Sequence, residues 1–280
     1  MKVLVTGANG YIGRHLINAL ANQGHDVVAC DICFDSVRND IKQVKINIFE
    51  DHNDIFKKLG CPDVCIHLAW RDGFIHNSDK HIGDLSSHFK FLTSMINGGL
   101  KHLSVMGTMH EVGYWEGMIE ENTPCHPQSM YGIAKNTLRE SLFLYVKGKD
   151  VDLKWLRAFY RLGDDKANNS IFSKIIIAAE KGQKTFPFTS GRNKYDFLNV
   201  EELASQIAAA STQQEISGII NCCKGTAVSL ASKVESFIME KGLDIKLEYG
   251  AYPDRPYDSP CIYGDPSKIN AIMKLSNNLK

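Results

Sequence analysis

A glycine-rich segment directly after the first apolar run constrains the fold of this 280-residue chain more than any other feature. The apolar run, residues 3–6, is typical of a buried strand, and residues 6–13 (TGANGYIG) follow it and open a helical pattern. The first glycine of such a turn permits a tight bend, the second lets the backbone approach a pyrophosphate, and the third lets the helix pack on the strand. The N–H groups and dipole of the helix then hold the anion. We therefore expect a dinucleotide at this turn, in contact with Gly7, Asn9, Gly10, Tyr11, Ile12 and Gly13.

Short β-branched runs alternate with amphipathic segments through the first half of the chain. This alternation is typical of a parallel sheet covered by helices on both faces, a doubly wound Rossmann-type α/β fold that binds ligands beyond the carboxyl ends of its strands. The expected strands are residues 3–6, 26–30, 44–48, 64–68, 103–106 and 153–158, and the expected helices are residues 11–22, 54–59, 85–97 and 131–145.

The second half of the chain is less regular. Helical patterns at residues 171–180, 201–210 and 228–239 are separated by loops that contain glycine, proline and aromatic residues. We predict a dinucleotide-binding Rossmann domain over residues 1–160 and a smaller C-terminal substrate-binding lobe over residues 161–280, interleaved with the first domain.

A carboxylate at the end of the second expected strand bears on the choice of cofactor. Asp31 stands where an acidic side chain accepts hydrogen bonds from the adenosine ribose hydroxyls. Its charge repels the extra phosphate of NADP, so the sequence favours NAD(H), with NADP(H) as the alternative. The ends of the third and fourth expected strands should border the adenine and the central part of the cofactor, at Asn47, Ile48, Leu68 and Ala69.

The composition argues against several classes of partner. Lysine plus arginine and aspartate plus glutamate number 32 each, which leaves no net field for nucleic acid or an anionic membrane. No run approaches the roughly 18 apolar residues of a membrane helix, and no secretory signal is visible, so we expect a soluble, cytoplasmic protein. The eight cysteines are expected to be reduced thiols and not metal ligands, and no metal site is predicted.

A tyrosine and a lysine in the expected helix at 131–145 have the spacing of an acid–base pair. Tyr131 and Lys135 stand one helical turn apart, so their side chains share a face. A phenol with a pKa of about 10 exchanges a proton near neutrality only if a neighbouring cation lowers that pKa. Thr108, after the fifth expected strand, either hydrogen-bonds the reacting oxygen or caps a turn. We expect Thr108, Tyr131 and Lys135 to be catalytic, with Tyr131 and Lys135 also contacting the cofactor.

These motifs together resemble an extended short-chain dehydrogenase/reductase of the nucleotide-sugar epimerase/dehydratase family, and the resemblance extends along nearly the whole chain. It implies a nucleoside-diphosphate sugar as substrate and a homodimer joined by the two long helices. Besides the glycine turn, Asp31 and the three catalytic residues, the matching segments are residues 67–69, 195–200, 255–258 and 265–268.

The residues expected at the substrate include both matches and departures from the family. The resemblance implies that the guanidinium of Arg255 grips the diphosphate. A further phosphate-binding arginine is frequent in the family near Tyr195, and here Arg192 or Lys194 would replace it. Trp70 replaces a frequent alanine, and Tyr160 stands where asparagine is frequent. The expected substrate-binding residues are Trp70, Met109, His110, Arg192 and Arg255.

The residues after the catalytic threonine separate the reactions of this family. The 4,6-dehydratases have an Asp-Glu pair there and the C3/C5 epimerase-reductases a cysteine base, whereas this chain has Met109 and His110. Because methionine cannot move a proton, both reactions are disfavoured. His110 and Glu111 either line the substrate pocket or, as is more common for such a pair, form a local hydrogen bond.

Two reactions remain within the family, and a third reading lies outside catalysis. The first is a 4-keto-reductase that reduces a nucleotide-linked 4-keto-6-deoxy sugar, with Tyr131 as proton donor. The second is a 4-epimerase that keeps its NAD. The short C-terminal lobe and the similarity of residues 107–113 to small deoxysugar reductases favour the reductase. The third is a dinucleotide-binding protein without turnover, against which the intact catalytic residues argue.

Overall fold

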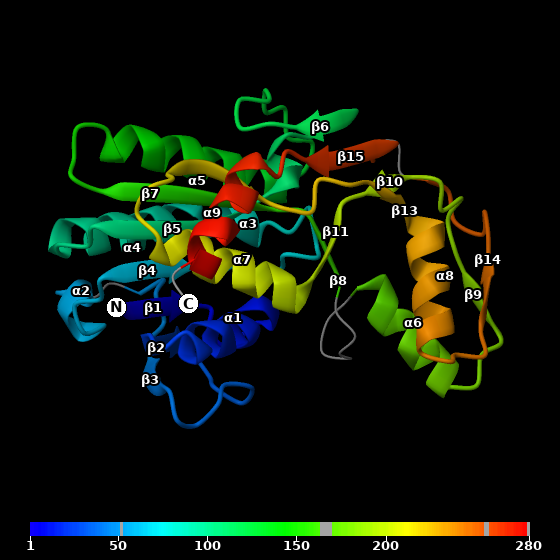
Figure 1. The fold of residues 1–280 in the computed structure, drawn as a ribbon, viewed down its shortest axis with the longest axis horizontal. Helices are drawn as coiled ribbons and strands as arrows, with labels where there is room; N and C mark the ends of the chain where they lie inside the picture. The colour runs from blue at the N-terminus through cyan, green and yellow to red at the C-terminus, as the bar shows by residue number, and fades with distance from the viewer. Residues whose placement is uncertain (51–52, 163–169, 255–257, 279–280) are drawn as a thin grey trace.

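In the computed structural model, which describes residues 1–50, 53–162, 170–254 and 258–278, a seven-stranded parallel sheet forms the core of the larger part of the molecule, on the left in Figure 1. The strand order is β12-β7-β5-β4-β1-β2-β3. From β1 the chain adds β2 and β3 on one side, and it then adds β4, β5, β7 and β12 on the other side. This reversal of strand order between β1 and β4 places a ligand crevice beyond the carboxyl ends of the two strands. The strands are β1 (Lys2–Thr6), β2 (Asp26–Asp31), β3 (Lys42–Lys45), β4 (Val64–His67), β5 (His102–Thr108), β7 (Asp152–Ala158) and β12 (Gly218–Cys222).

Alternate residues of the strands supply two separate cores. Val3 and Val5 of β1 belong to one core and Leu4 to the other, because successive side chains of a strand point to opposite faces of the sheet. Both faces are therefore covered, and the predicted doubly wound parallel sheet is confirmed. The first core is covered by α1 (Tyr11–Asn22), α7 (Val200–Thr212) and α9 (Ser267–Asn278), and the second by α2 (Ile55–Lys58), α4 (Leu85–Gly98) and α5 (Met130–Val146).

A smaller lobe lies to the right of the main sheet in Figure 1. Its core joins α6 (Ile171–Glu180) and α8 (Leu230–Glu240) through buried side chains such as Ile175 and Val234. Short strands form three smaller sheets in this part of the molecule. One has four strands in the order β13-β10-β15-β6, and the other two are pairs of strands. These strands are β6 (Gly117–Ile119), β10 (Lys194–Tyr195), β13 (Val228–Ser229), β15 (Cys261–Gly264), the pair β8 (Tyr160–Leu162) and β11 (Phe197–Asn199), and the pair β9 (Thr185–Pro187) and β14 (Lys246–Glu248).

Three elements from the second half of the chain belong to the main sheet and its covering helices. β12 pairs in parallel with β7, from Gly218 opposite Lys154 to Cys222 opposite Ala158. α7 and α9 pack on the same core as α1. The chain thus returns to the main sheet and its covering helices after residue 200. The domain boundary at residue 160 stays a prediction.

The third strand ends earlier than the sequence indicated. We expected residues 44–48, but β3 is Lys42–Lys45. Its pairing with β2 stops where Lys45 faces Asp31, the last residue of β2, and the N–H of Ile46 then donates to the carbonyl oxygen of Asp31 at 3.1 Å. Asn47 and Ile48 therefore lie in the loop after the strand and do not end it.

The last helix of the smaller lobe also begins later than expected. Residue 228 was predicted to be its first, but Val228 pairs with Tyr195 between β13 and β10. The Oγ of Ser229 accepts a hydrogen bond from the N–H of Ser232 at 3.1 Å, which caps α8 so that it starts at Leu230. None of the helices among the described residues is both long enough and apolar enough to cross a membrane.

Candidate active site

The glycine turn has the backbone geometry that a bound pyrophosphate needs. Gly7 has a φ of +69°, and a Cβ there would lie 2.6 Å from the backbone nitrogen of Ala69. A Cβ at Gly13 would lie 2.3 Å from the carbonyl oxygen of Gly7. A side chain at either position would therefore clash with backbone. α1 begins after Gly10, which has no side chain to cap the N–H groups of the first turn, so those groups suit an anion.

The other expected residues of this turn lie around the same crevice. Leu68 and Ala69 pass within contact distance of Gly7. Tyr11 and Ile12 open α1, where Tyr11 is half-buried and Ile12 packs against the core beneath β1. The turn, the end of β4 and the start of α1 thus form one surface, which fits the central part of a dinucleotide.

Asp31 connects the end of β2 to the glycine turn. Its carboxylate accepts hydrogen bonds from the N–H groups of Asn9, at 2.9 Å, and Ile32, at 2.7 Å. The side-chain oxygen of Asn9 accepts from the N–H of Ser36 at 2.8 Å, which fastens the loop after β2 to the same turn. An ionised carboxylate has roughly four acceptor positions, so Asp31 retains capacity for the ribose hydroxyls.

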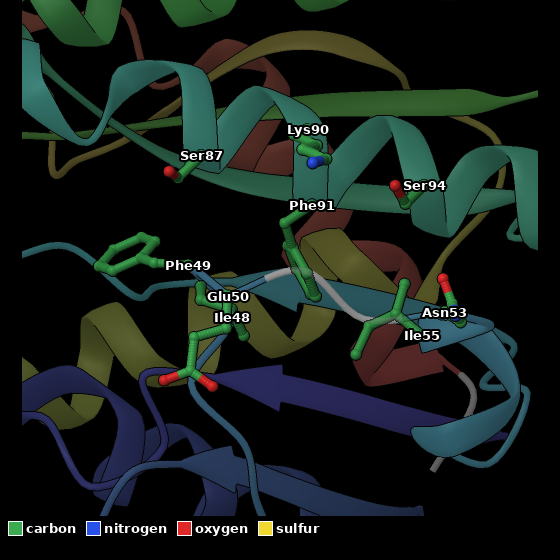
Figure 2. A pocket seen from close by; sticks show the side chains of 9 residues that line it. All are labelled: Ile48, Phe49, Glu50, Asn53, Ile55, Ser87, Lys90, Phe91 and Ser94. Atoms are coloured by element: carbon green, nitrogen blue, oxygen red, sulfur yellow. The ribbon is translucent and has the colours of Figure 1, made fainter.

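A cavity of about 180 Å³ lies between α4 and the loop after β3 (Figure 2). Phe91 points from α4 toward Ile48 of the loop after β3 and Ile55 at the start of α2. Asn47 precedes the lining residue Ile48 in the chain, and its side-chain amide donates to the carboxylate of Glu50 at 2.9 Å. The walls of the cavity combine apolar and polar side chains, which could contact the faces and the edge of a flat heterocyclic base, so this cavity is compatible with the expected adenine end of the cofactor. The lining residues are Ile48, Phe49, Glu50, Asn53, Ile55, Ser87, Lys90, Phe91 and Ser94.

Lys135 joins α5 to the carboxyl end of β5. Its side chain is 2% exposed, and its Nζ donates to the carbonyl oxygen of Met106 at 2.7 Å. Burial lowers the pKa of Lys135 to about 7, and the negative charge of Glu111 opposes this shift in part. The structure thus places an amine that changes its charge near neutrality on the helical turn after Tyr131.

Tyr131 is placed by the backbone around the start of α5. The Oγ of Ser129 accepts from the N–H of Gly132 at 3.1 Å, and the N–H of Tyr131 donates to the carbonyl oxygen of His76 at 2.9 Å. A Cβ at Gly132 would lie 2.3 Å from the carbonyl oxygen of His110, so the glycine lets α5 approach the 3₁₀ turn η1 (Met109–Glu111). The ring of Tyr131 has its centroid 6.0 Å from that of His110 and 5.8 Å from that of His76.

Thr108 is the last residue of β5, where it faces Ala158 of β7. Its Oγ1 accepts from the N–H of His110 at 3.3 Å, and its own N–H donates to the Oε1 of Glu111 at 2.7 Å. Thr108 therefore does cap the turn. A hydroxyl that accepts one hydrogen bond still carries its own hydrogen, so the cap is compatible with donation to a reacting oxygen.

A second cavity lies beside Tyr131. Of the residues expected at the substrate, Met109 and His110 line it. The rings of Tyr160 and Tyr195 lie on its wall with centroids 3.9 Å apart. The other described residues that line it were not predicted from the sequence; they are His76, Gly113, Gln128, Ser129, Asp258, Ser259 and Ile262.

Two of the remaining expected substrate residues, Trp70 and Arg192, do not line this cavity. Trp70 lies against Lys135 and not on the wall of this cavity. Arg192 is exposed and is not among the described residues that line the cavity. Arg255 lies outside the described residues. Ser129 had a local signal that could have identified it, since a serine just before an amphipathic pattern predicts a helix cap, whereas His76 is brought to the site only by the tertiary fold.

The cysteines show no sign of a metal centre. All eight are free thiols, and burial raises the pKa of Cys30 and Cys222 to about 12. Over the described parts of the chain, no group of three or more histidine, cysteine, aspartate or glutamate side chains is placed to hold a metal ion.

Comparison with known proteins places this geometry in a family. Residues 3–223 match the model of the NAD dependent epimerase/dehydratase family. The chain is 43% identical to the dTDP-6-deoxy-L-talose 4-dehydrogenase (NAD(+)) of Aggregatibacter actinomycetemcomitans, over 94% of this chain and 99% of that protein. It is 24% identical to the UDP-glucose 4-epimerase of Neisseria meningitidis serogroup B, over 96% of this chain and 91% of that protein.

A solved structure shows the same fold. The UDP-glucose-4-epimerase of Stenotrophomonas maltophila, with bound NAD and formylated UDP-arabinopyranose, superposes with a TM-score of 0.86 at 19% identity, over 98% of this chain and 92% of that one. Together with the glycine turn, Asp31 and the Tyr131–Lys135 helix, these matches show that the chain is an NAD-dependent enzyme of the NAD dependent epimerase/dehydratase family.

Proposed function

We propose that the chain is a nucleoside-diphosphate-sugar oxidoreductase that acts at C4 of a 6-deoxyhexose, in the direction of a 4-keto-reductase. The observation that carries the proposal is the 43% identity, along nearly the full length of both chains, to a 4-dehydrogenase of dTDP-6-deoxy-L-talose. A 4-dehydrogenase and a 4-keto-reductase catalyse the same reaction in opposite directions.

The second cavity has a volume of about 30 Å³, which admits one small group of a deoxysugar and not the whole ring. Met109 and the adjacent rings of Tyr160 and Tyr195 give it apolar walls, which suit a methyl carbon at C6. His76, His110 and Gln128 add donors and acceptors for an adjacent hydroxyl. The diphosphate would be held by Arg255, with Arg192 or Lys194 nearby on the exposed side.

The chemistry follows from Tyr131, Lys135 and Thr108. In the reductive direction the phenol of Tyr131 donates its proton to the carbonyl oxygen at sugar C4 as a hydride reaches the same carbon, so a ketone becomes an alcohol. When bound, NADH supplies that hydride and leaves as NAD⁺. Lys135 lowers the pKa of the phenol and holds the nicotinamide ribose, and Thr108 orients the reacting oxygen through its hydroxyl.

A coupled pair of absorbance assays tests the reaction. The enzyme is incubated with dTDP-6-deoxy-L-talose and NAD⁺, and in a second cell with the corresponding dTDP-4-keto-6-deoxyhexose and NADH, and absorbance at 340 nm is followed. We expect NADH to form in the first cell and to be consumed in the second. No change in either cell, with a protein that binds NADH, would overturn the proposal.

The 4-epimerase is the alternative that the same experiment addresses. The enzyme would then interconvert C4 epimers, such as UDP-glucose and UDP-galactose, with no net change at 340 nm, and NAD would copurify with it. The non-catalytic alternative, a protein that only binds the dinucleotide, conflicts with the match to NAD-dependent enzymes. The presence of Thr108, Tyr131 and Lys135 at one end of β5 and α5 argues against it, because a protein that only binds needs no phenol beside a buried amine.

A further inference from the structure

Trp70 follows the end of β4, and its indole ring covers the amine of Lys135. The Nζ of Lys135 lies 3.8 Å from the centroid of the ring. The same Nζ also donates a hydrogen bond to the carbonyl oxygen of Met106. An ammonium close to an indole face is attracted by the negative face of the ring, and most strongly where water is excluded, as it is around Lys135.

The indole ring is held at its edge by His81 of α3 (Lys80–Gly83). The Nε1 of Trp70 donates to the Nδ1 of His81 at 3.0 Å. Because Nδ1 accepts this hydrogen bond, the hydrogen of the neutral imidazole is on Nε2, which donates to the carbonyl oxygen of Ile75 at 2.9 Å. His81 itself is 1% exposed, so its ring is held within the protein between the indole and the backbone.

The face of the same ring is held by His88 of α4. The two rings are nearly parallel, with centroids 4.4 Å apart and an angle of 13° between their planes. The Nδ1 of His88 lies 2.9 Å from the Nε2 of His67, and this hydrogen bond fixes the ring of His88. The Nδ1 of His67 lies in turn 2.8 Å from the hydroxyl of Thr6. Burial lowers the pKa of His67 to about 3 and lowers that of His88 as well, so both rings are neutral and add no charge that would repel Lys135.

We propose that Trp70 is a positioning residue, which holds the ammonium of Lys135 beside Tyr131 through its indole face and is itself fixed by His81 and His88. Desolvation alone favours the neutral amine of Lys135, and the indole face offsets this by favouring the charged form. The ring of Tyr131 lies at the edge of the same indole, with centroids 6.1 Å apart, so Trp70 contacts both residues of the expected acid–base pair.

The test measures NADH affinity, by fluorescence titration without any sugar, so its outcome does not depend on the proposed substrate. Trp70→Phe keeps an aromatic face, whereas Trp70→Met fills similar space without one. We expect Trp70→Phe to bind NADH within about threefold of the wild type and Trp70→Met to bind about tenfold more weakly. Trp70→Leu is a second non-aromatic replacement, so that a folding defect in Trp70→Met does not decide the result.

A double-mutant cycle shows whether the effect passes through the amine. Trp70→Met is combined with Lys135→Met, and the affinity of each single and double variant is compared. We expect Trp70→Met to cost no further affinity once the amine is gone. The proposal is overturned if Trp70→Phe and the non-aromatic variants weaken NADH binding equally, or if Trp70→Met has the same effect with and without Lys135.

Discussion

Both carboxylate oxygens of Glu111 lie 2.9 Å from the indole Nε1 of Trp155, in a part of the core where neither side chain is exposed. The same carboxylate accepts from the N–H of Thr108, and its Oε2 lies 3.6 Å from the Nε of Arg157. Glu111 thus turns into the core, while its neighbour His110 lines the cavity. The hydrogen bond from the N–H of Thr108 to Glu111 thereby fixes Thr108 at the end of β5.

Glu111→Gln should strongly destabilise the fold. The amide keeps one acceptor for Trp155 but removes the negative charge that faces the buried guanidinium of Arg157, and breaking a buried ion pair costs about 3–5 kcal/mol. Urea unfolding gives the free energy of unfolding. The matched control Glu240→Gln, at an exposed glutamate of α8, should change it by less than about 0.5 kcal/mol. Equal effects of the two substitutions would refute this role of Glu111.

Asp31→Asn should relax the preference for NAD(H) over NADP(H). The amide oxygen can still accept from the N–H of Asn9, whereas the hydrogen bond from the N–H of Ile32 and the charge that repels the extra phosphate are lost. We expect the ratio of NADH to NADPH affinities to fall about tenfold or more, measured by fluorescence titration. Asp35→Asn, on the exposed part of the same loop, is the control and should leave the ratio unchanged. A wild type that prefers NADPH would show that Asp31 does not have this function.

His67 should make the protein sensitive to acid. Burial lowers its pKa in the folded state to about 3, whereas in the unfolded chain it is about 6.5. Below pH 6.5 the unfolded state therefore binds a proton that the folded state does not, and stability is lost as the pH falls toward 3. Between pH 6.5 and 4.5 the wild type should lose about 2 kcal/mol more than His67→Gln, measured by urea unfolding at each pH.

An exposed histidine provides the control for this pH series. His126→Gln should follow the wild type over the same range, because His126 is exposed and does not belong to the buried pair of His67 and His88. If His67→Gln and the wild type lose stability in parallel, His67 is not the group that titrates on unfolding.

The parts of the site that sequence could predict are those with local patterns. Gly13 is constrained by backbone atoms of Gly7 and Ala8 within the same turn, and Asp31 ends a strand of continuous apolar residues. Tyr131 and Lys135 share a helix face, which fixes their relation without any long-range contact. The fold class followed from the same alternation of strand and helix patterns.

The parts that sequence could not predict depend on contacts between distant segments. His76 reaches Tyr131, and Trp70 reaches Lys135, only after β4, α3 and α5 have packed together. Strands of two or three residues, such as β10 and β13, are too short to show a period of two. The end of β3 was misplaced because apolar residues continue past the last hydrogen bond to β2.

The chain is expected to form a homodimer through α4 and α5. The two helices lie side by side, where the hydroxyl of Tyr145 donates to the side-chain oxygen of Asn97 at 2.7 Å, and α5 exposes Ile133 and Leu144. Light scattering at micromolar concentration should give twice the mass of one chain. Leu144→Asp should shift it toward the monomer, while Met239→Asp, on the equally exposed surface of α8, should not. A monomeric wild type would contradict this expectation.

The most direct test of the whole account is the turnover of Tyr131→Phe with the 4-keto-6-deoxyhexose substrate and NADH, measured beside its affinity for NADH. The substitution removes the phenolic hydroxyl and leaves the ring among His76, His110 and Trp70, so the cofactor should bind as in the wild type. Turnover should fall by about 10²–10⁴-fold, the usual range for the loss of a positioned acid or base. A Tyr131→Phe enzyme with near-normal turnover would mean that another acid, such as His110, carries the proton, and would contradict the proposed mechanism.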